Sequence, residues 1–123
     1  MKKFFTFLIA FLSISFISEA KYVQTCAAKY KTEDGWSKTY KVNFTFMAGY
    51  EMNTATKTYN YDMYSIYAII FWGEGKATII KSSNYLSCGT EVAKSCISSS
   101  ISDIKGKDQD GDEWNVCVST YCY

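Results

Sequence analysis

The sequence predicts a mostly β fold: a small antiparallel barrel or sandwich of five or six strands, disulfide-stapled, with at most a short helix. Apolar side chains recur with a period of two in several segments, as in half-buried strands. Aromatic and β-branched residues, which favour strands, are abundant. Five cysteines follow residue 20, and small exported domains often use disulfides to supplement a limited core.

The first twenty residues have the three-part pattern of a secretory signal peptide. Lys2 and Lys3 give a positive start, residues 4–17 are apolar, and Ser18-Glu19-Ala20 is a small-x-small cleavage sequence. A retained membrane anchor is the alternative, but the apolar stretch is shorter than the ~20 residues of a spanning helix. We therefore expect residues 1–20 to be removed. Residues 21–123 would then form one secreted or periplasmic domain of a bacterial envelope, without a stable membrane anchor.

The charged residues exclude several kinds of chemistry. The chain has 13 basic residues, all of them lysine, against 12 acidic residues, and it has no histidine. Histidine-based catalysis, imidazole zinc ligands and guanidinium clamps are therefore excluded. A balanced charge offers no polycation, so nucleic-acid binding is not expected. No cofactor is predicted.

The first strands follow from local patterns. A strand is predicted over residues 22–31, ending in the turn Glu33-Asp34-Gly35. In residues 40–46 apolar and polar side chains alternate, so the apolar ones share a face. These are Tyr40, Val42, Phe44 and Phe46. Residues 49–55 can hold a short helix, and nearby threonines argue against a longer one.

Two hairpins are predicted in the second half of the chain. Residues 64–72 are apolar on both faces, which indicates a central strand covered on both sides. The turn 73–75 and the returning strand 77–80 complete the first hairpin. Residues 101–107 and 113–118 form the second hairpin around a turn at 108–111, and residues 82–100 are predicted to be a disulfide-bridged loop.

The cysteines indicate disulfides rather than a metal site. Residues Cys26, Cys88, Cys96, Cys117 and Cys122 contain no Cys-x-x-Cys pair, which a structural zinc site normally uses. Two bridges are expected, and their connectivity stays open. The fifth thiol is expected to be buried, while an intermolecular bridge that makes a covalent dimer and a reactive thiol are the alternatives.

Asp108, Asp110 and Asp112 have the spacing with which calcium loops begin. Counted from Asp108, however, position 6 is Glu113 instead of glycine and position 12 is Ser119 instead of glutamate. We therefore interpret the segment as a hairpin turn in which Gly111 supplies a positive φ. A looser calcium site stays open, but no metal is predicted.

The tyrosines and tryptophans indicate a binding function. Eleven tyrosines and three tryptophans exceed what a small core needs. Five of them lie just before or within the predicted central strand: Tyr59, Tyr61, Tyr64, Tyr67 and Trp72. Aromatic rings on a sheet can form a rigid recognition face, although such rings also pack in β cores. We predict a non-catalytic binding module for a protein or a glycan.

Paired carboxylates are the remaining catalytic option, because glycoside cleavage needs two acids across a cleft. The candidates are Glu51, Asp62, Glu74 and Glu91, and no local pattern distinguishes any of them. Exposed acids that aid solubility are the simpler interpretation. An enzyme is not expected, and a small carboxylate-based hydrolase is kept as an alternative.

Residues 68–88 carry a resemblance to a known family. Phe71-Trp72, Gly75, Ala77 and Cys88 resemble the strand pair and final cysteine of the membrane-bound inhibitors of c-type lysozyme. The resemblance implies a small periplasmic β-barrel and, as an alternative function, an inhibitor or immunity protein against a hydrolase such as lysozyme. The Trp-to-Ala spacing is one residue shorter here and the family's Ser-Ala-Ser-Gly-Ala stretch is absent, so no functional residue is carried over.

Overall fold

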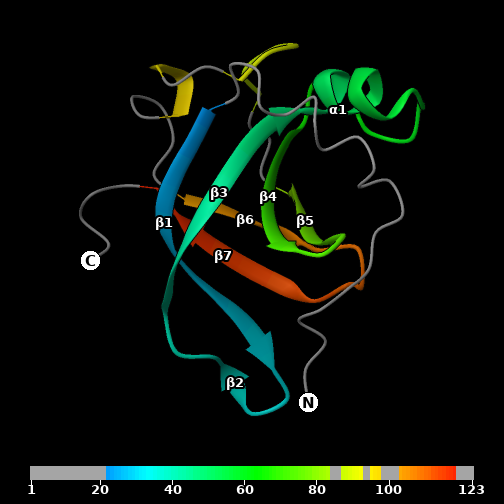
Figure 1. Cartoon of the computed structure of the whole chain (residues 1–123). Coiled ribbons are helices and arrows are strands. Elements are labelled where there is room, and N and C mark those ends of the chain that lie inside the picture. The colour runs from blue at the N-terminus through cyan, green and yellow to red at the C-terminus, as the bar shows by residue number, and fades with distance from the viewer. Residues whose placement is uncertain (1–21, 84–86, 93–94, 98–102, 119–123) are drawn as a thin grey trace.

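The computed structural model describes residues 22–83, 87–92, 95–97 and 103–118, and it shows an antiparallel barrel (Figure 1). Six strands close in the order β1-β3-β4-β5-β6-β7, with β7 pairing back onto β1, and β2 adds to β1 outside the barrel. The elements are β1 (Tyr22–Thr32), β2 (Gly35–Trp36), β3 (Tyr40–Ala48), α1 (Gly49–Thr56), β4 (Ile66–Gly73), β5 (Lys76–Ser82), β6 (Asp103–Lys107) and β7 (Glu113–Cys117). The predicted mostly β antiparallel fold is confirmed, and of the two predicted architectures it is the barrel.

Side-chain alternation fills the barrel interior. On β3, Phe44 and Phe46 point into the core and are fully buried, while Lys41 and Asn43 between the apolar positions are exposed. Strands β1, β4, β5, β6 and β7 contribute in the same way. The resulting inner cluster includes Cys26, Ala28, Phe44, Phe46, Ile66, Ala68, Ile80, Ile104, Trp114 and Val116.

A second apolar cluster lies on the other face of β3, β4 and β5, which explains why residues 66–70 of β4 are all buried. We call it the outer cluster, and its buried members are Met47, Met52, Tyr67, Ile69, Ala77 and Ile79. Helix α1 supplies Met52, and Tyr61 and Phe71 are partly buried against the cluster. The two-sided burial predicted for residues 64–72 is thus observed for residues 66–70, whereas Tyr64 and Trp72 at the two ends are exposed.

Helix α1 is fixed at its first turn. A Cβ on Gly49 would lie 1.6 Å from the Asp62 carbonyl oxygen, so only glycine fits between the helix start and the chain that leads to β4. Glu51 Oε1 accepts hydrogen bonds from the Ala48 N–H at 2.9 Å and from the Val92 N–H at 3.2 Å. One carboxylate therefore satisfies a free N–H at the helix start and holds the later segment beside it.

The cysteines divide into bridged and buried ones. Cys88 and Cys96 form a disulfide within the predicted bridged loop. Cys117 is also disulfide-bonded, whereas Cys122 lies outside the described residues. Cys26 is a free thiol in the barrel interior, and burial raises its pKa to about 12. The expected buried unpaired thiol is therefore Cys26.

The predicted signal peptide, residues 1–20, lies outside the described residues. Within the described segments, no helix is long and apolar enough to cross a membrane.

Candidate functional site

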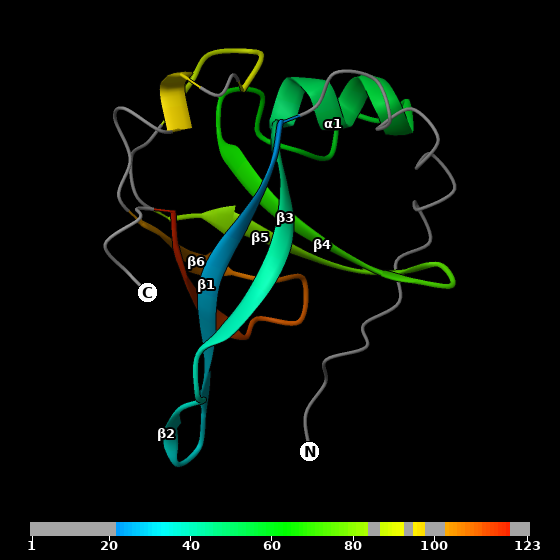
Figure 2. The same cartoon turned by 60° about the vertical axis from the view of Figure 1, so that its left-hand side comes forward.

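A groove of about 1110 Å³ lies on the outer face of β1, β7, β6 and β5. Its wall on one side is Trp36 of β2, and on the other side it is the chain around Asp62 and Ser65, just before β4. The β1–β2 hairpin projects beyond the barrel, at the end opposite α1 (Figure 2). The charged side chains that line the groove are Lys29, Lys81, Lys105, Lys107, Asp62, Asp108 and Glu113.

Strand register arranges the floor of the groove in cross-strand rows. Asn115 on β7 pairs with Lys29 on β1 at one side and with Lys105 on β6 at the other. Directly paired residues of antiparallel strands point to the same face, so these three side chains share the outer surface. The backbone carbonyl of Lys105 accepts hydrogen bonds from the Ser83 N–H at 2.7 Å and the Ser83 hydroxyl at 2.9 Å, which extends the row past β5.

The neighbouring row carries opposite charges. Lys107 on β6 pairs with Glu113 on β7 and with Lys81 on β5. Lys81 Nζ lies 2.6 Å from Asp62 Oδ2. The hydrogen bond from Lys81 and its positive charge lower the pKa of Asp62, and the same hydrogen bond raises the pKa of Lys81. The ion pair connects the chain before β4, which forms one wall of the groove, to β5 in the floor of the groove.

Trp36 is placed by a tight turn. Gly35 has a φ of +118°, which favours glycine, and the Thr32 hydroxyl donates a hydrogen bond to the Gly35 carbonyl at 2.7 Å. Strand β2 pairs Trp36 with Lys31, and the indole stays 44% exposed. Lys29 Nζ lies 5.3 Å from the centre of the indole ring, within the range of a cation–π contact.

Asp108 forms one end of the groove, but its carboxylate oxygens already accept hydrogen bonds from its own hairpin. Its Oδ1 accepts hydrogen bonds from the N–H groups of Asp110 at 2.9 Å and Asp112 at 3.0 Å, and Oδ2 accepts one from Trp114 Nε1 at 2.9 Å. Burial raises the pKa of this carboxyl, and the three donors oppose that shift. With the positive φ of Gly111, these bonds make the predicted turn.

The same turn is the place where a metal ion could be held. Asp108, Asp110 and Asp112 each offer a carboxylate oxygen, and these oxygens lie within 4.8 Å of one another. Both oxygens of Asp108 already accept N–H groups, so the arrangement stands without an ion.

The structure divides the predicted aromatic face. Tyr67 is only 4% exposed and lies in the outer cluster, where Tyr61 meets it edge-on at 5.3 Å. The Tyr67 hydroxyl accepts a hydrogen bond from the Asp62 N–H at 2.9 Å. Burial raises the pKa of both tyrosines. These two rings therefore pack and position the Asp62 segment.

The other three predicted aromatic residues remain at the surface. Tyr59 is 96% and Tyr64 58% exposed, both on the chain between α1 and β4. Trp72 lies at the end of β4, where its Nε1 donates a hydrogen bond to the Thr78 hydroxyl at 2.8 Å. None of the five lines the groove. The predicted set is therefore not brought together on one exposed face.

The four candidate carboxylates lie at different places in the structure. Glu51 caps α1, and Asp62 pairs with Lys81. Glu74 lies in the β4–β5 turn with a φ of 54°, and Glu91 is exposed. Only Asp62 of the four lines the groove.

Sequence reasoning missed Trp36 and the lysines of the groove. The signal for Trp36 was its position directly after the predicted turn 33–35, where a returning strand could begin. Lys29 and Lys105 are far apart in the chain and meet only through their pairing with Asn115.

No protein-family model matches this chain, and comparisons with curated proteins and with solved structures also find no match. The resemblance to lysozyme inhibitors thus rests on residues 68–88 alone, and the functional interpretation rests on the geometry of the groove.

Proposed function

We propose that the protein is an exported, non-catalytic binding module that holds a glycan in the groove between β2 and the chain before β4. The observation that carries the proposal is the exposed indole of Trp36 at the rim of a polar groove.

Sugars present apolar C–H faces and a periphery of hydroxyl groups, and this groove offers partners for both. The indole of Trp36 is a rigid apolar surface that a sugar ring can stack on. Beside it, the Asn115 amide and the lysine ammonium groups supply hydrogen-bond donors. The Asn115 amide oxygen and the Ser83 hydroxyl oxygen, whose proton is donated to the Lys105 carbonyl, supply acceptors.

Binding without catalysis is supported by the state of the groove carboxylates. Glycoside hydrolysis needs two acids with separate acid and base or nucleophile roles. Asp62 is engaged by Lys81 at 2.6 Å, and Asp108 accepts three N–H groups of its own hairpin. Only Glu113 is left among the acids that line the groove, and its cross-strand neighbour is Lys107.

Export is supported by the cysteines. The Cys88–Cys96 disulfide is typical of proteins outside the cytosol. The pattern of residues 1–20 supports secretion to the periplasm or medium.

Titration calorimetry with soluble oligosaccharides tests the proposal. The probes are cellohexaose, chitohexaose and hexagalacturonate. Trp36→Ala should weaken binding of the best ligand about five- to thirtyfold, because stacking on an aromatic ring contributes on the order of 1–2 kcal/mol.

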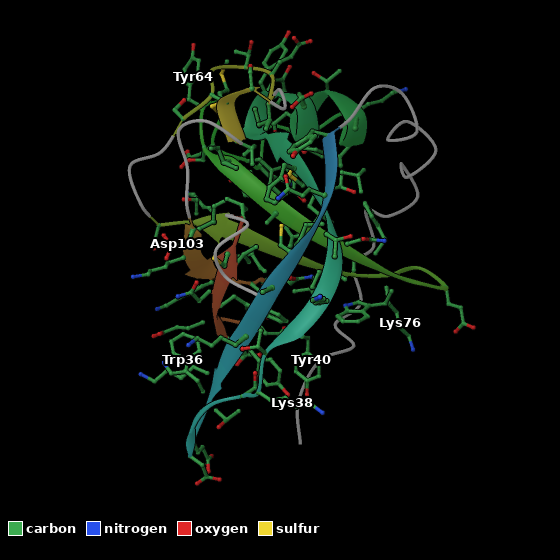
Figure 3. All side chains as sticks on the ribbon, turned by 90° about the vertical axis from the view of Figure 1, so that its left-hand side faces the viewer. Trp36, Lys38, Tyr40, Tyr64, Lys76 and Asp103 are labelled. Atoms are coloured by element: carbon green, nitrogen blue, oxygen red, sulfur yellow. A yellow bond between two sulfur atoms is a disulfide. The ribbon has the colours of Figure 1, made fainter. Side chains whose placement is uncertain are left out.

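Tyr50→Ala is the matched control, since it also removes a partly exposed ring, but on α1, at the end of the molecule opposite Trp36 (Figure 3). It should leave the affinity unchanged. No binding of any probe by the wild-type protein, or equal loss in both variants, would contradict the proposal.

A protein partner is the second candidate, favoured by a group of exposed apolar side chains. Met63 and Tyr50 are brought together by a 2.9 Å hydrogen bond from the Tyr50 N–H to the Met63 carbonyl. With Tyr59 and Tyr64 they expose four large apolar side chains on α1 and the chain after it. An inhibitor of a hydrolase such as lysozyme would use this surface. In that case Tyr64→Ala weakens inhibition in a lysozyme assay and Trp36→Ala does not.

A further inference from the structure

We infer that the end of the barrel that carries α1 is a membrane-facing surface, which holds the exported domain reversibly on a lipid bilayer. This surface is separate from the groove, so the inference does not depend on glycan binding.

The first argument is the group of exposed apolar side chains at this end. Tyr50 lies on α1, and Tyr59, Met63 and Tyr64 lie on the chain between α1 and β4. Each of these four side chains is between 42% and 96% exposed. Single exposed apolar residues are ordinary on a protein surface, whereas several within one segment indicate an interaction site. We call these four residues the α1-end surface.

The second argument is that the α1-end surface is preformed. The Asn53 side chain on α1 donates a hydrogen bond to the Tyr61 carbonyl at 2.9 Å and accepts one from the Tyr61 N–H at 2.9 Å. The Tyr50 N–H donates a hydrogen bond to the Met63 carbonyl at 2.9 Å. These bonds fix the chain after α1 against the helix, so little ordering entropy is lost when the surface binds.

The third argument is the kind of side chain. Three of the four residues are tyrosines, which gather where a membrane meets water because the ring is apolar and the hydroxyl is polar. An apolar ring can enter the region between headgroups and acyl chains while its hydroxyl stays hydrated. The affinity of such a surface scales with the apolar area that it buries.

The fourth argument is the place where the chain enters the barrel. Tyr22 pairs with Phe46 on β3, two residues before β3 ends at Ala48 and α1 begins, so β1 starts at the α1 end (Figure 2). Only residues 18–21 separate Tyr22 from the apolar segment 4–17, which a membrane takes up during export. Five peptide units reach at most about 18 Å. The α1 end is therefore the part of the domain that lies next to the bilayer before cleavage.

The charges near this surface do not oppose a bilayer. Glu51 accepts two backbone N–H groups, and Asp62 is paired with Lys81 at 2.6 Å. Lys57 and Glu91 are exposed and have opposite signs. Apolar burial must then supply the affinity, and binding should depend little on lipid charge or on salt.

Sedimentation with sucrose-loaded vesicles tests the inference. The protein is the chain that begins at residue 21, which contains every described residue and lacks the apolar segment. Vesicles of phosphatidylcholine are compared with vesicles that also contain phosphatidylglycerol, at about 20 mM and about 200 mM salt. We expect binding to both, with a partition coefficient that changes less than about twofold among these conditions.

Variants locate the binding surface. Tyr59→Ser with Tyr64→Ser should lower the partition coefficient at least about fivefold, because two rings no longer bury apolar area. Tyr59→Ser alone should act in the same direction without affecting the fold, since this side chain is 96% exposed. Trp36→Ala is the matched control. It removes an exposed ring at the opposite end of the molecule and should leave the partition coefficient unchanged.

The orientation is tested by quenching with brominated phosphatidylcholine. Tyr64→Trp should add fluorescence that the brominated lipid quenches. The native tryptophans should not be quenched, because Trp36 and Trp72 lie toward the other end of the barrel and Trp114 is buried.

Other results overturn the inference. No vesicle binding, or equal binding by all variants, excludes the α1-end surface as a membrane contact. Binding that requires phosphatidylglycerol and disappears at high salt excludes the apolar mode. Without vesicle binding, Tyr64-dependent inhibition of lysozyme assigns the surface to a protein partner, and a dimer that the double variant dissociates assigns it to a second copy of the chain.

Discussion

The side chain of Gln109 takes the place of a strand opposite Ile79. Its Oε1 accepts a hydrogen bond from the Ile79 N–H at 2.8 Å, and its Nε2 donates one to the Ala77 carbonyl at 2.8 Å. The β5–β6 register, with Lys81 opposite Lys107, would place residue 109 opposite Ile79 if β6 continued. Since the chain turns at Asp108 instead, the amide side chain continues the ladder along β5.

Gln109→Ala should therefore open the edge of β5. Two backbone groups lose their partners, and we expect a loss of about 1–2 kcal/mol in the free energy of unfolding. Amide exchange at Ile79 should accelerate. Gln109→Glu is the matched variant, because it keeps the acceptor for Ile79 and removes only the donor to Ala77. It should preserve the slow exchange at Ile79, and unchanged exchange in the alanine variant would refute this role.

Glu51 is predicted to be structural. Glu51→Ala removes the acceptor shared by the N–H groups of Ala48 and Val92, so unfolding in urea should show a loss of about 1–2 kcal/mol. Glu51→Gln keeps an oxygen at this position and should retain most of the stability. Glycan affinity should be the same in both variants. An alanine variant as stable as the wild type would be inconsistent with the cap.

The Asp62–Lys81 ion pair should make the free energy of unfolding depend on pH in the acidic range. Because Lys81 holds the pKa of Asp62 below its usual range, the pair stabilises the fold above about pH 4. The stabilisation is lost as the pH falls through the lowered pKa.

Lys81→Gln should therefore reduce stability near neutral pH and converge with the wild type as the pH approaches about 2. The effect should be small, because both side chains are at least half exposed. NMR titration should show the pKa of Asp62 rising in this variant. If the pKa of Asp62 is the same in Lys81→Gln as in the wild type, the ion pair between Asp62 and Lys81 in the groove wall is contradicted.

Cys26 should resist alkylation in the folded protein. Its thiol is fully buried and its pKa is raised to about 12, so neither access nor thiolate is available at pH 8. Iodoacetamide should label Cys26 only in denaturant, as mass spectrometry of the peptides can show. Rapid labelling without denaturant would contradict the position of Cys26 inside the barrel.

Most strands could be predicted because their signals are local. The alternation of residues 40–46 appears as β3, and the two predicted hairpins appear as β4–β5 and β6–β7. The choice between barrel and sandwich could not be made locally. It depends on the pairing of β1 with β7, where Ala27 meets Cys117 from the other end of the chain.

The candidate site was harder to predict for the same reason. Side-chain alternation indicates that Lys29 points outward, but only the pairing with Asn115 places Lys105 beside it. Tyr67 shows a different limit of prediction from local sequence. A strand with apolar residues on both faces has no exposed face, and the ring at this position packs in the outer cluster instead of forming a surface.

The most direct test of the central claim is NMR perturbation mapping with the tightest-binding of the oligosaccharide probes on ¹⁵N-labelled protein. We predict that the largest shifts occur at the Trp36 indole N–H and at the amides of Lys29, Lys105 and Asn115. The amides of Tyr50 and Tyr59 should not move. Shifts concentrated at Tyr50 and Tyr59, or no shifts at saturating ligand, would contradict the assignment of the groove as the binding site.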